Sequence, residues 1–244
     1  VGVALVLTAV WQQGIGLGAL AGLVAGGAFW LPNISWLTLY LGPVPWLGLS
    51  GVMILWYALF GLCAAVATRG LARTLRGLAL TPRGLALTPR GRTALLVLCQ
   101  SLAAAGLWVL REQAQGFWPY GGFAWGRLAH TQAEGPLAPL VSWVGFSGLT
   151  GLLALACAIP VAVAFAVHRS RAGGARRAAK AVAIPTSIAA AGVVAALALL
   201  SLVPPAALEQ TGTLRVGEVQ GHSQSGLFDD REHGTFSGRS LILL

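Results

Sequence analysis

The sequence contains very little charge. Only 9% of its 244 residues are Asp, Glu, Lys or Arg, and none of these four types occurs before Arg69. A soluble domain carries about 25% charged residues, because its surface must face water. Apolar residues make up 56% of this chain, and its mean hydropathy is +0.75. These values exclude a water-soluble fold and predict an all-α polytopic membrane helix bundle.

Cysteine and methionine are also scarce. The three cysteines, Cys63, Cys99 and Cys157, each lie in an apolar run, where free cysteine behaves as a small hydrophobic residue. Their spacing fits neither a disulfide framework nor a metal site, so we expect no metal and no cofactor. The only methionine is Met53, and the chain starts at Val1 inside an apolar run without a signal-peptide pattern. We therefore expect a fragment whose N-terminus is missing.

The net charge of +9 comes mostly from two short blocks between apolar runs. Eleven of the sixteen basic residues lie there: Arg69, Arg73, Arg76, Arg83, Arg90 and Arg92 in one block, and Arg169, Arg171, Arg176, Arg177 and Lys180 in the other. Basic residues that flank membrane spans mark the cytoplasmic side. This distribution explains the charge better than phosphate binding does, and we expect no nucleic-acid partner.

Several apolar runs approach the length of about 20 residues that a spanning helix needs. The predicted spans are 14–31, 46–68, 93–110, 137–167 and 181–203, preceded by a half-span at 1–10. Pro32 and the Gly42–Pro45 segment predict that Ile34–Leu41 is interfacial or re-entrant, and Pro160 predicts a kink. We assign 1–204 to a transmembrane domain and 205–244 to the start of a second domain.

The orientation follows from the two basic blocks. If both are cytoplasmic, residues 111–136 and 204–244 lie outside the cytoplasm, on the same side of the membrane. These are the two most polar segments of the chain, so we expect its chemistry there. We predict a multi-pass protein of the cell membrane whose C-terminal domain is extracytoplasmic.

Residues 111–136 alternate aromatic residues with glycines. The aromatic residues are Phe117, Trp118, Tyr120, Phe123 and Trp125, and the glycines are Gly116, Gly121, Gly122 and Gly126. Glycines permit tight bends, and aromatic residues with a polar edge favour the depth of lipid headgroups. Polar groups accompany them at Arg111, Glu112, Arg127, His130 and Glu134. The composition suits a loop that binds lipid, although an ordinary interfacial loop fits it equally well.

The same loop resembles a known family. Trp118-Pro119-Tyr120-Gly121-Gly122-Phe123-Ala124-Trp125-Gly126-Arg127-Leu128-Ala129, then Thr131-Gln132 and Gly135-Pro136-Leu137-Ala138-Pro139-Leu140, resembles the apolipoprotein N-acyltransferases. Tyr120 stands where that family usually has Phe, and Ala124 replaces a Pro. Residues 18–40 resemble its early helix and following loop. Residues 214–221 resemble the first strand of its nitrilase-like domain, an α/β fold, with His222 in place of Asn.

The resemblance implies a membrane domain followed by the truncated start of the nitrilase-like domain. It further implies transfer of an acyl chain from a membrane phospholipid to the N-terminal diacylglyceryl-cysteine of a lipoprotein. The family's Glu–Lys–Cys triad has no counterpart that we can assign in this chain, so we expect the chain alone to be inactive. The candidate substrate-binding residues are Trp118, Tyr120, Gly121, Gly122, Phe123, Trp125, Arg127 and Gln132.

Two alternatives remain open. A multi-span transporter or channel subunit is possible, although coupled transporters usually place ionisable groups inside their spans and the predicted spans contain none. A membrane scaffold for a glycosyltransferase is the other, since some relatives are fused to a polyprenol-phosphate mannose synthase. The sequence shows no such synthase domain.

Overall fold

A computed structural model describes residues 2–79, 88–170, 175–206 and 212 of the chain. Within this part, four helices are long and apolar enough to cross a membrane: Ile15–Asn33, Pro43–Leu75, Gly91–Gln115 and Ala138–His168. The prediction of an all-α polytopic membrane bundle is therefore confirmed. The strand predicted at 214–221, and nearly all of the predicted second domain, lie outside the described residues.

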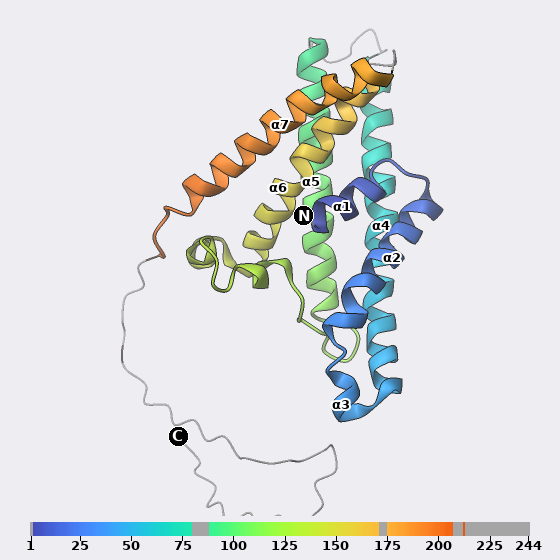
Figure 1. Ribbon diagram of the computed structural model, residues 1–244, viewed down its shortest axis with the longest axis vertical. Helices are drawn as coiled ribbons and strands as arrows, with labels where there is room; N and C mark the ends of the chain where they lie inside the picture. Colours follow the sequence, from blue (N-terminus) through green and yellow to red (C-terminus); the bar gives the residue numbers. More distant parts are fainter. Residues whose placement is uncertain (1, 80–87, 171–174, 207–211, 213–244) are drawn as a thin grey trace, which may run out of the picture.

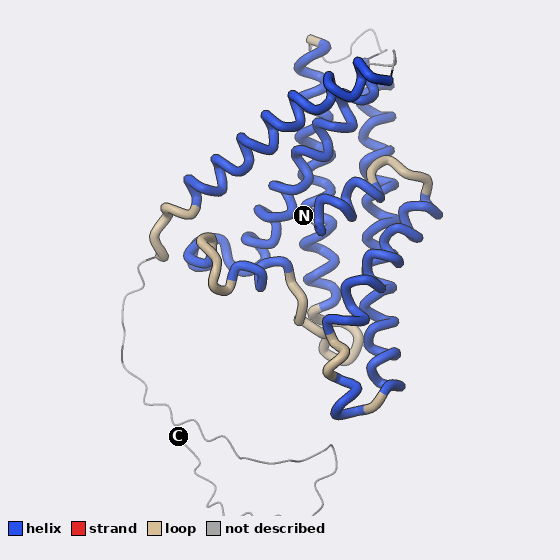
Figure 2. The backbone as a smooth tube through the Cα atoms, in the orientation of Figure 1, coloured by secondary structure: helices blue, strands red, loops and turns tan. Residues whose placement is uncertain are grey.

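Helices follow one another along the described parts of the chain, and the longest described connection joins α5 to α6 (Figures 1 and 2). Their bounds are α1 Gly2–Val10, α2 Ile15–Asn33, α3 Leu37–Leu41, α4 Pro43–Ala79, α5 Pro89–Gln115, α6 Val141–Ser170 and α7 Ala175–Leu200, with two 3₁₀ helices, η1 Leu128–Gln132 and η2 Ala138–Leu140. Four of the predicted spans fall on α2, α4, α5 and α6, whereas the span predicted at 181–203 falls on α7, whose apolar stretch among the described residues, Pro185–Leu200, is shorter than a full span. The predicted half-span at 1–10 is α1, which packs against α2 and α6.

Different helix ends and connections lie at the two ends of the bundle. The end of α4, the start of α5, the end of α6 and the start of α7 lie at one end, whereas α3 and the connection from α5 to α6 lie toward the other (Figure 1). The helix ends that border the two basic blocks therefore share one end of the bundle. This arrangement is the one that the predicted topology requires; which end faces the cytoplasm stays a prediction.

Small residues bring α2 and α4 into close contact. Gly18, Gly22 and Gly26 follow one another at every fourth position and are buried against α4. A Cβ atom on Gly22 would overlap the backbone carbonyl of Tyr57, and one on Gly61 would overlap the carbonyl of Gly18. Such close backbone approach is how helices associate in lipid, where no hydrophobic force drives them together.

Two helix details differ from the sequence-based expectation. α4 continues through Thr68 into the first basic block and ends at Ala79. In α6 the non-helical residue is Gly145, with φ 69° and ψ 176°, which was not predicted from the sequence; Pro160 lies inside the helical stretch, and a kink there stays a prediction. Glycine adopts positive φ without steric cost, and neighbouring groups in a bundle can compensate for the missing N–H of a proline.

The end of α7 is tied to the start of α6. Trp143 Nε1 donates a hydrogen bond to the Pro204 carbonyl at 2.8 Å, and the Ala206 N–H donates to Ser142 Oγ at 2.7 Å. These bonds fix where the chain leaves the bundle, near the connection between α5 and α6.

Candidate functional site

The site is built on the last turn of α5, which extends further than the sequence suggested. We expected the span to end at Leu110 and a surface loop to begin at Arg111, but the helix continues to Gln115. Arg111 and Glu112 are buried, with 4% and 3% of their surfaces exposed. The expectation was wrong because charged residues in sequence suggest an exit into water, whereas here each charge finds partners inside the protein.

The carboxylate of Glu112 is an acceptor for four donors. Its Oε1 atom accepts hydrogen bonds from Trp108 Nε1 at 2.9 Å, from the Leu128 N–H at 2.9 Å and from Arg111 Nη2 at 3.3 Å. Its Oε2 atom accepts from Thr150 Oγ1 of α6 at 2.9 Å. Both oxygens of this carboxylate are therefore engaged, Oε1 by three donors and Oε2 by one. Glu112 acts as an anchoring group that joins α5, α6 and the start of η1.

Arg111 balances that buried charge. Beyond its ion pair with Glu112, its Nη1 atom donates to Gln115 Oε1 at 3.0 Å. The centre of its guanidinium lies 4.1 Å from the ring centroid of Tyr57 and 4.8 Å from that of Trp108. Such stacking and pairing compensate the cost of burying a cation. Among the described residues, this is the one ion pair in the structure.

Gln115 holds the loop that follows. Its side-chain amide donates to the carbonyls of Phe123 at 3.1 Å and Trp125 at 3.3 Å. In return, the Phe123 N–H donates to the Gln115 backbone carbonyl at 2.8 Å. The ring of Phe123 lies against the buried indole of Trp30, with centroids 5.8 Å apart. The loop is thus held both by polar bonds to α5 and by aromatic packing on α2.

Two glycines allow the loop to fold back on α5. Gly122 has φ +80°, and a Cβ atom there would overlap the backbone of Gly116. Gly126 has φ +69°, and its Cβ atom would lie 2.9 Å from the Trp30 ring. Both positions require positive φ and close approach, which only glycine provides at low cost. Gly121 also has a positive φ, +87°, but faces open space.

Aromatic side chains of the loop project outward. The exposed fractions are 74% for Phe117, 64% for Trp118 and 59% for Trp125, and Tyr120 is fully exposed. Contiguous exposed aromatic residues mark contact with a membrane or a partner. At a membrane surface, indole and phenol rings favour the headgroup depth.

Arg127 is the cation of the loop and lacks a carboxylate partner in the described part of the chain. Its Nη2 atom lies over Gly116, where an added Cβ would be only 2.7 Å away, at the C-terminal end of α5. That end of a helix carries partial negative charge and favours a cation. The backbone N–H of Arg127 donates to His130 Nδ1 at 3.2 Å. This bond caps the N-terminus of η1.

A cavity of about 930 Å³ opens beside Arg127. Its polar lining includes Arg127, His130 and Thr131, and most of its other walls are apolar side chains of α1, α2, α5 and α6. A cation at the edge of an apolar cavity can bind an amphiphile that has an anionic group and a hydrocarbon chain. Gln132 does not line this cavity and instead donates to the Thr131 carbonyl at 3.3 Å.

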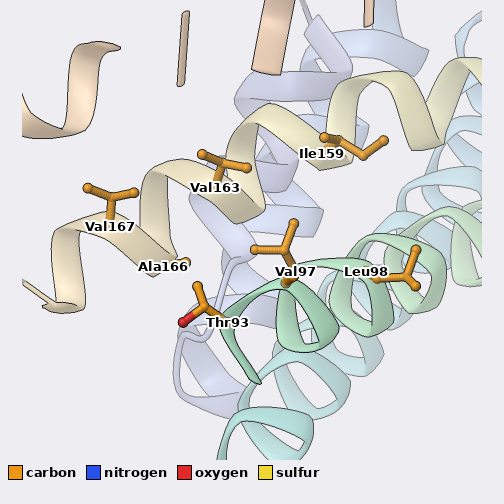
Figure 3. Close-up of a pocket in the computed structure, with 8 residues that line it drawn as sticks. Thr93, Val97, Leu98, Ile159, Val163, Ala166 and Val167 are labelled. Carbon is orange, nitrogen blue, oxygen red and sulfur yellow. The ribbon is translucent and has the colours of Figure 1, made fainter. Parts of the chain in front are cut away.

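A second pocket lies at the other end of the bundle, between α5 and α6 (Figure 3). It has a volume of about 650 Å³ and is lined by Thr93, Ala94, Val97, Leu98, Ile159, Val163, Ala166 and Val167. This lining contains no charged side chain, so it offers hydrocarbon contact without a group for chemistry.

The described residues contain no cluster of three or more His, Cys, Asp or Glu that could hold a metal ion. Cys63, Cys99 and Cys157 are half-buried in α4, α5 and α6 respectively. They come from three different helices and carry no visible nucleophile–base arrangement.

Sequence reasoning missed the buried residues that hold Arg111, Glu112 and the loop in place. Thr150, Gln115 and Trp108 were not selected, although the pairs Trp108–Glu112 and Arg111–Gln115 have the i, i+4 spacing that brings side chains together on a helix. Among the candidate residues, the structure brings Phe123 and Trp125 together at Gln115, and Gly122 and Arg127 together at Gly116. Trp118, Tyr120 and Gly121 lie further out, on the exposed edge of the loop.

Comparison with protein families gives one finding. The model of the apolipoprotein N-acyltransferase N-terminal domain matches residues 1–159. This range includes α1 to α5, the whole loop and Thr150 of α6. No solved structure matches the chain.

Proposed function

The chain belongs to the apolipoprotein N-acyltransferase family, and from this premise we propose that residues 116–132 form the site at which the membrane part of the enzyme receives its phospholipid acyl donor. The acyl chain passes to the N-terminal diacylglyceryl-cysteine of a lipoprotein. The candidate residues for this binding are Trp118, Tyr120, Gly121, Gly122, Phe123, Trp125, Arg127 and Gln132.

The observation that carries the proposal is the place of Arg127. Arg127 has no carboxylate partner among the described residues and is one of the residues that line an apolar cavity of about 930 Å³. A guanidinium binds phosphate through charge-assisted hydrogen bonds, often in a bidentate geometry. A phospholipid fits both features, because its phosphate can pair with Arg127 and its acyl chain can occupy the apolar cavity.

The exposed aromatic residues support the same assignment. Trp118 and Trp125 project from the loop at the end of the bundle that we predict to be extracytoplasmic. Their rings suit the boundary between headgroups and acyl chains. We propose that Trp125 packs on the donor's hydrocarbon while the positive φ values of Gly121 and Gly122 let the loop bend back toward Arg127.

The acyl transfer itself belongs, by the family's chemistry, to the nitrilase-like domain. There a cysteine thiolate attacks the ester carbonyl of the phospholipid and releases a lysophospholipid, and the lipoprotein amine then displaces the thiol from the thioester. The membrane part contributes binding and orientation of the donor.

The test is acyl transfer by a complete enzyme of the family that carries the same loop. Arg127→Ala and Trp125→Ala should lower kcat/KM at limiting phospholipid while membrane insertion stays normal. Removing a charge-assisted pair at a partly wet site costs about 1–3 kcal/mol, or about five- to 150-fold in rate. Arg73→Ala is the matched control, because Arg73 is an exposed arginine at the other end of the bundle. Wild-type kcat/KM in Arg127→Ala at limiting phospholipid would contradict the proposal.

A further inference from the structure

Glu112 lies directly behind the proposed donor site without reaching it. Trp108, Arg127 and Leu128 line the cavity, but Glu112 is not among its lining residues. Its two oxygens accept four hydrogen bonds from protein groups, and the residue is only 3% exposed. Any influence of Glu112 on the donor must therefore act through a neighbouring group.

The neighbour is the backbone next to Arg127. The N–H of the peptide that joins Arg127 to Leu128 donates to Glu112 Oε1 at 2.9 Å. The next N–H, that of Ala129, donates to Thr150 Oγ1 at 3.3 Å, and Thr150 in turn donates to Glu112 Oε2. Two successive peptide groups after Arg127 are thus fixed to α5 and α6 through one carboxylate and one hydroxyl.

Burying the Glu112 carboxylate costs desolvation free energy, and a stable helix bundle does not need a buried charge at this position. Replacing a buried ion pair with well-packed apolar residues is often neutral or stabilising, and ionisable groups at membrane depth tend to be functional. Apolar side chains in place of Glu112 could pack between α5 and α6. They could not accept the Leu128 N–H, so they would leave the backbone beside Arg127 free to shift.

We propose that Glu112, together with Thr150, is a positioning residue of the acyl-donor site, which holds the guanidinium of Arg127 where the donor's phosphate binds. This inference rests on the proposed function, since it requires that Arg127 binds the phosphate. Glu112 contributes a fixed acceptor at the first turn of η1, and Arg111 forms an ion pair with it in this buried place.

The first experiment compares steady-state acyl transfer in a complete family enzyme that carries the same residues. Glu112→Gln should raise the KM for phospholipid on the order of ten-fold with a smaller effect on kcat, because a charged acceptor is lost. Thr150→Val should raise that KM in the same direction, and Thr150→Ser, which keeps the hydroxyl, should restore it. Glu134→Gln is the matched control, since Glu134 is an exposed glutamate close to the same loop.

The deciding measurement is a double-mutant cycle with Arg127→Ala. If Glu112 acts by placing Arg127, Glu112→Gln should have little further effect on kcat/KM once Arg127 is alanine. If Glu112 only stabilises the fold, the two effects should multiply, and that result would overturn the inference. Size-exclusion profiles and thermal midpoints verify folding; if Glu112→Gln does not accumulate, the Thr150→Val and Thr150→Ser pair carries the same cycle.

The two proposals fail in different ways. Wild-type kcat/KM in Arg127→Ala would remove the proposed donor site and this inference with it. An impaired Arg127→Ala enzyme, combined with unchanged phospholipid KM in Glu112→Gln and Thr150→Val, would leave the donor site standing and refute the positioning role alone.

Discussion

The indole rings of Trp36 and Trp125 lie 5.8 Å apart, with their planes inclined by 39°. Trp36 directly precedes α3, whereas Trp125 belongs to the connection between α5 and α6, and both rings are exposed. The contact joins the aromatic edge of the loop to the α3 segment. It creates a continuous aromatic surface at this end of the bundle, as expected where a protein meets lipid headgroups.

This surface predicts that Trp125 contacts lipid directly. In vesicles that contain phospholipids brominated near the headgroup, Trp125→Phe should remove part of the quenchable tryptophan fluorescence. Trp11→Phe should remove none of the headgroup-dependent quenching, because Trp11 is 1% exposed. Equal loss of quenching in the two variants would show that Trp125 does not face the lipid interface.

The packing of α2 on α4 makes a second prediction. Gly22→Ala places a methyl group into the carbonyl of Tyr57 and should lower stability by about 1–3 kcal/mol, as overpacking does. Gly16→Ala, on the same helix, meets no atom within 4 Å. It should be neutral or slightly stabilising, because Ala favours a helix over Gly by about 1 kcal/mol. Thermal midpoints in detergent measure the order; a Gly22→Ala protein as stable as wild type would contradict the observed interface.

Adjacent glycines of the loop predict a graded effect. Gly121→Ala should cost about 1–2 kcal/mol, the penalty for a left-handed alanine, because the added methyl group points into open space. Gly122→Ala carries the same penalty and also overlaps the backbone of Gly116, so it should displace the loop from α5. Acyl transfer and the thermal midpoint of the complete enzyme should both fall further for Gly122→Ala. The reverse order would show that the loop does not fold back on Gly116 as described.

The sequence was sufficient to predict the spans on α2, α4, α5 and α6, because hydropathy over about 20 residues sums contributions that each residue makes independently of its neighbours. The end of α5 could not be predicted in this way. Whether Arg111 and Glu112 stay in the helix depends on Thr150 and Tyr57, which are distant in sequence and come from α6 and α4. A hydropathy profile contains no information on side-chain partners that are distant in sequence.

The loop shows the same division between local and distant information. Its aromatic residues and glycines identified it as the candidate site, since turn chemistry and interfacial preference are local properties. The role of Gln115, whose side chain bonds to the carbonyls of Phe123 and Trp125, depends on how the chain returns to α5. The break at Gly145 is similar, because α6 also contains Gly148 and Gly151, and of these three glycines only Gly145 has a positive φ.

The three cysteines should stay free of acyl chains. Cys63, Cys99 and Cys157 are half-buried in apolar helices, and cysteines in such surroundings are inert, unlike thiolates in electropositive, accessible sites. Incubation of this chain with labelled phospholipid, followed by hydroxylamine treatment and mass spectrometry, should give no thioester on any of them. A stable acyl adduct on any of the three would contradict this prediction. Cys157 is the most sensitive test, because it borders the cavity beside Arg127.

The orientation of the bundle is the last prediction, and it can be measured in intact cells. In a variant without native cysteines, a cysteine at Arg73 near the end of α4 and one at Thr131 in η1 both occupy exposed positions. The end of α4 lies at one end of the bundle, and the connection from α5 to α6, which contains η1, lies toward the other (Figure 1). Because the two basic blocks mark the cytoplasmic side, a membrane-impermeant maleimide should label Thr131→Cys in intact cells and Arg73→Cys only after permeabilisation. The opposite pattern would place the loop in the cytoplasm, where Trp118, Trp125 and Arg127 could not receive a donor for transfer outside the cell. Labelling of both sites without permeabilisation would indicate a leaky membrane, which a cytoplasmic protein measured in the same cells would reveal.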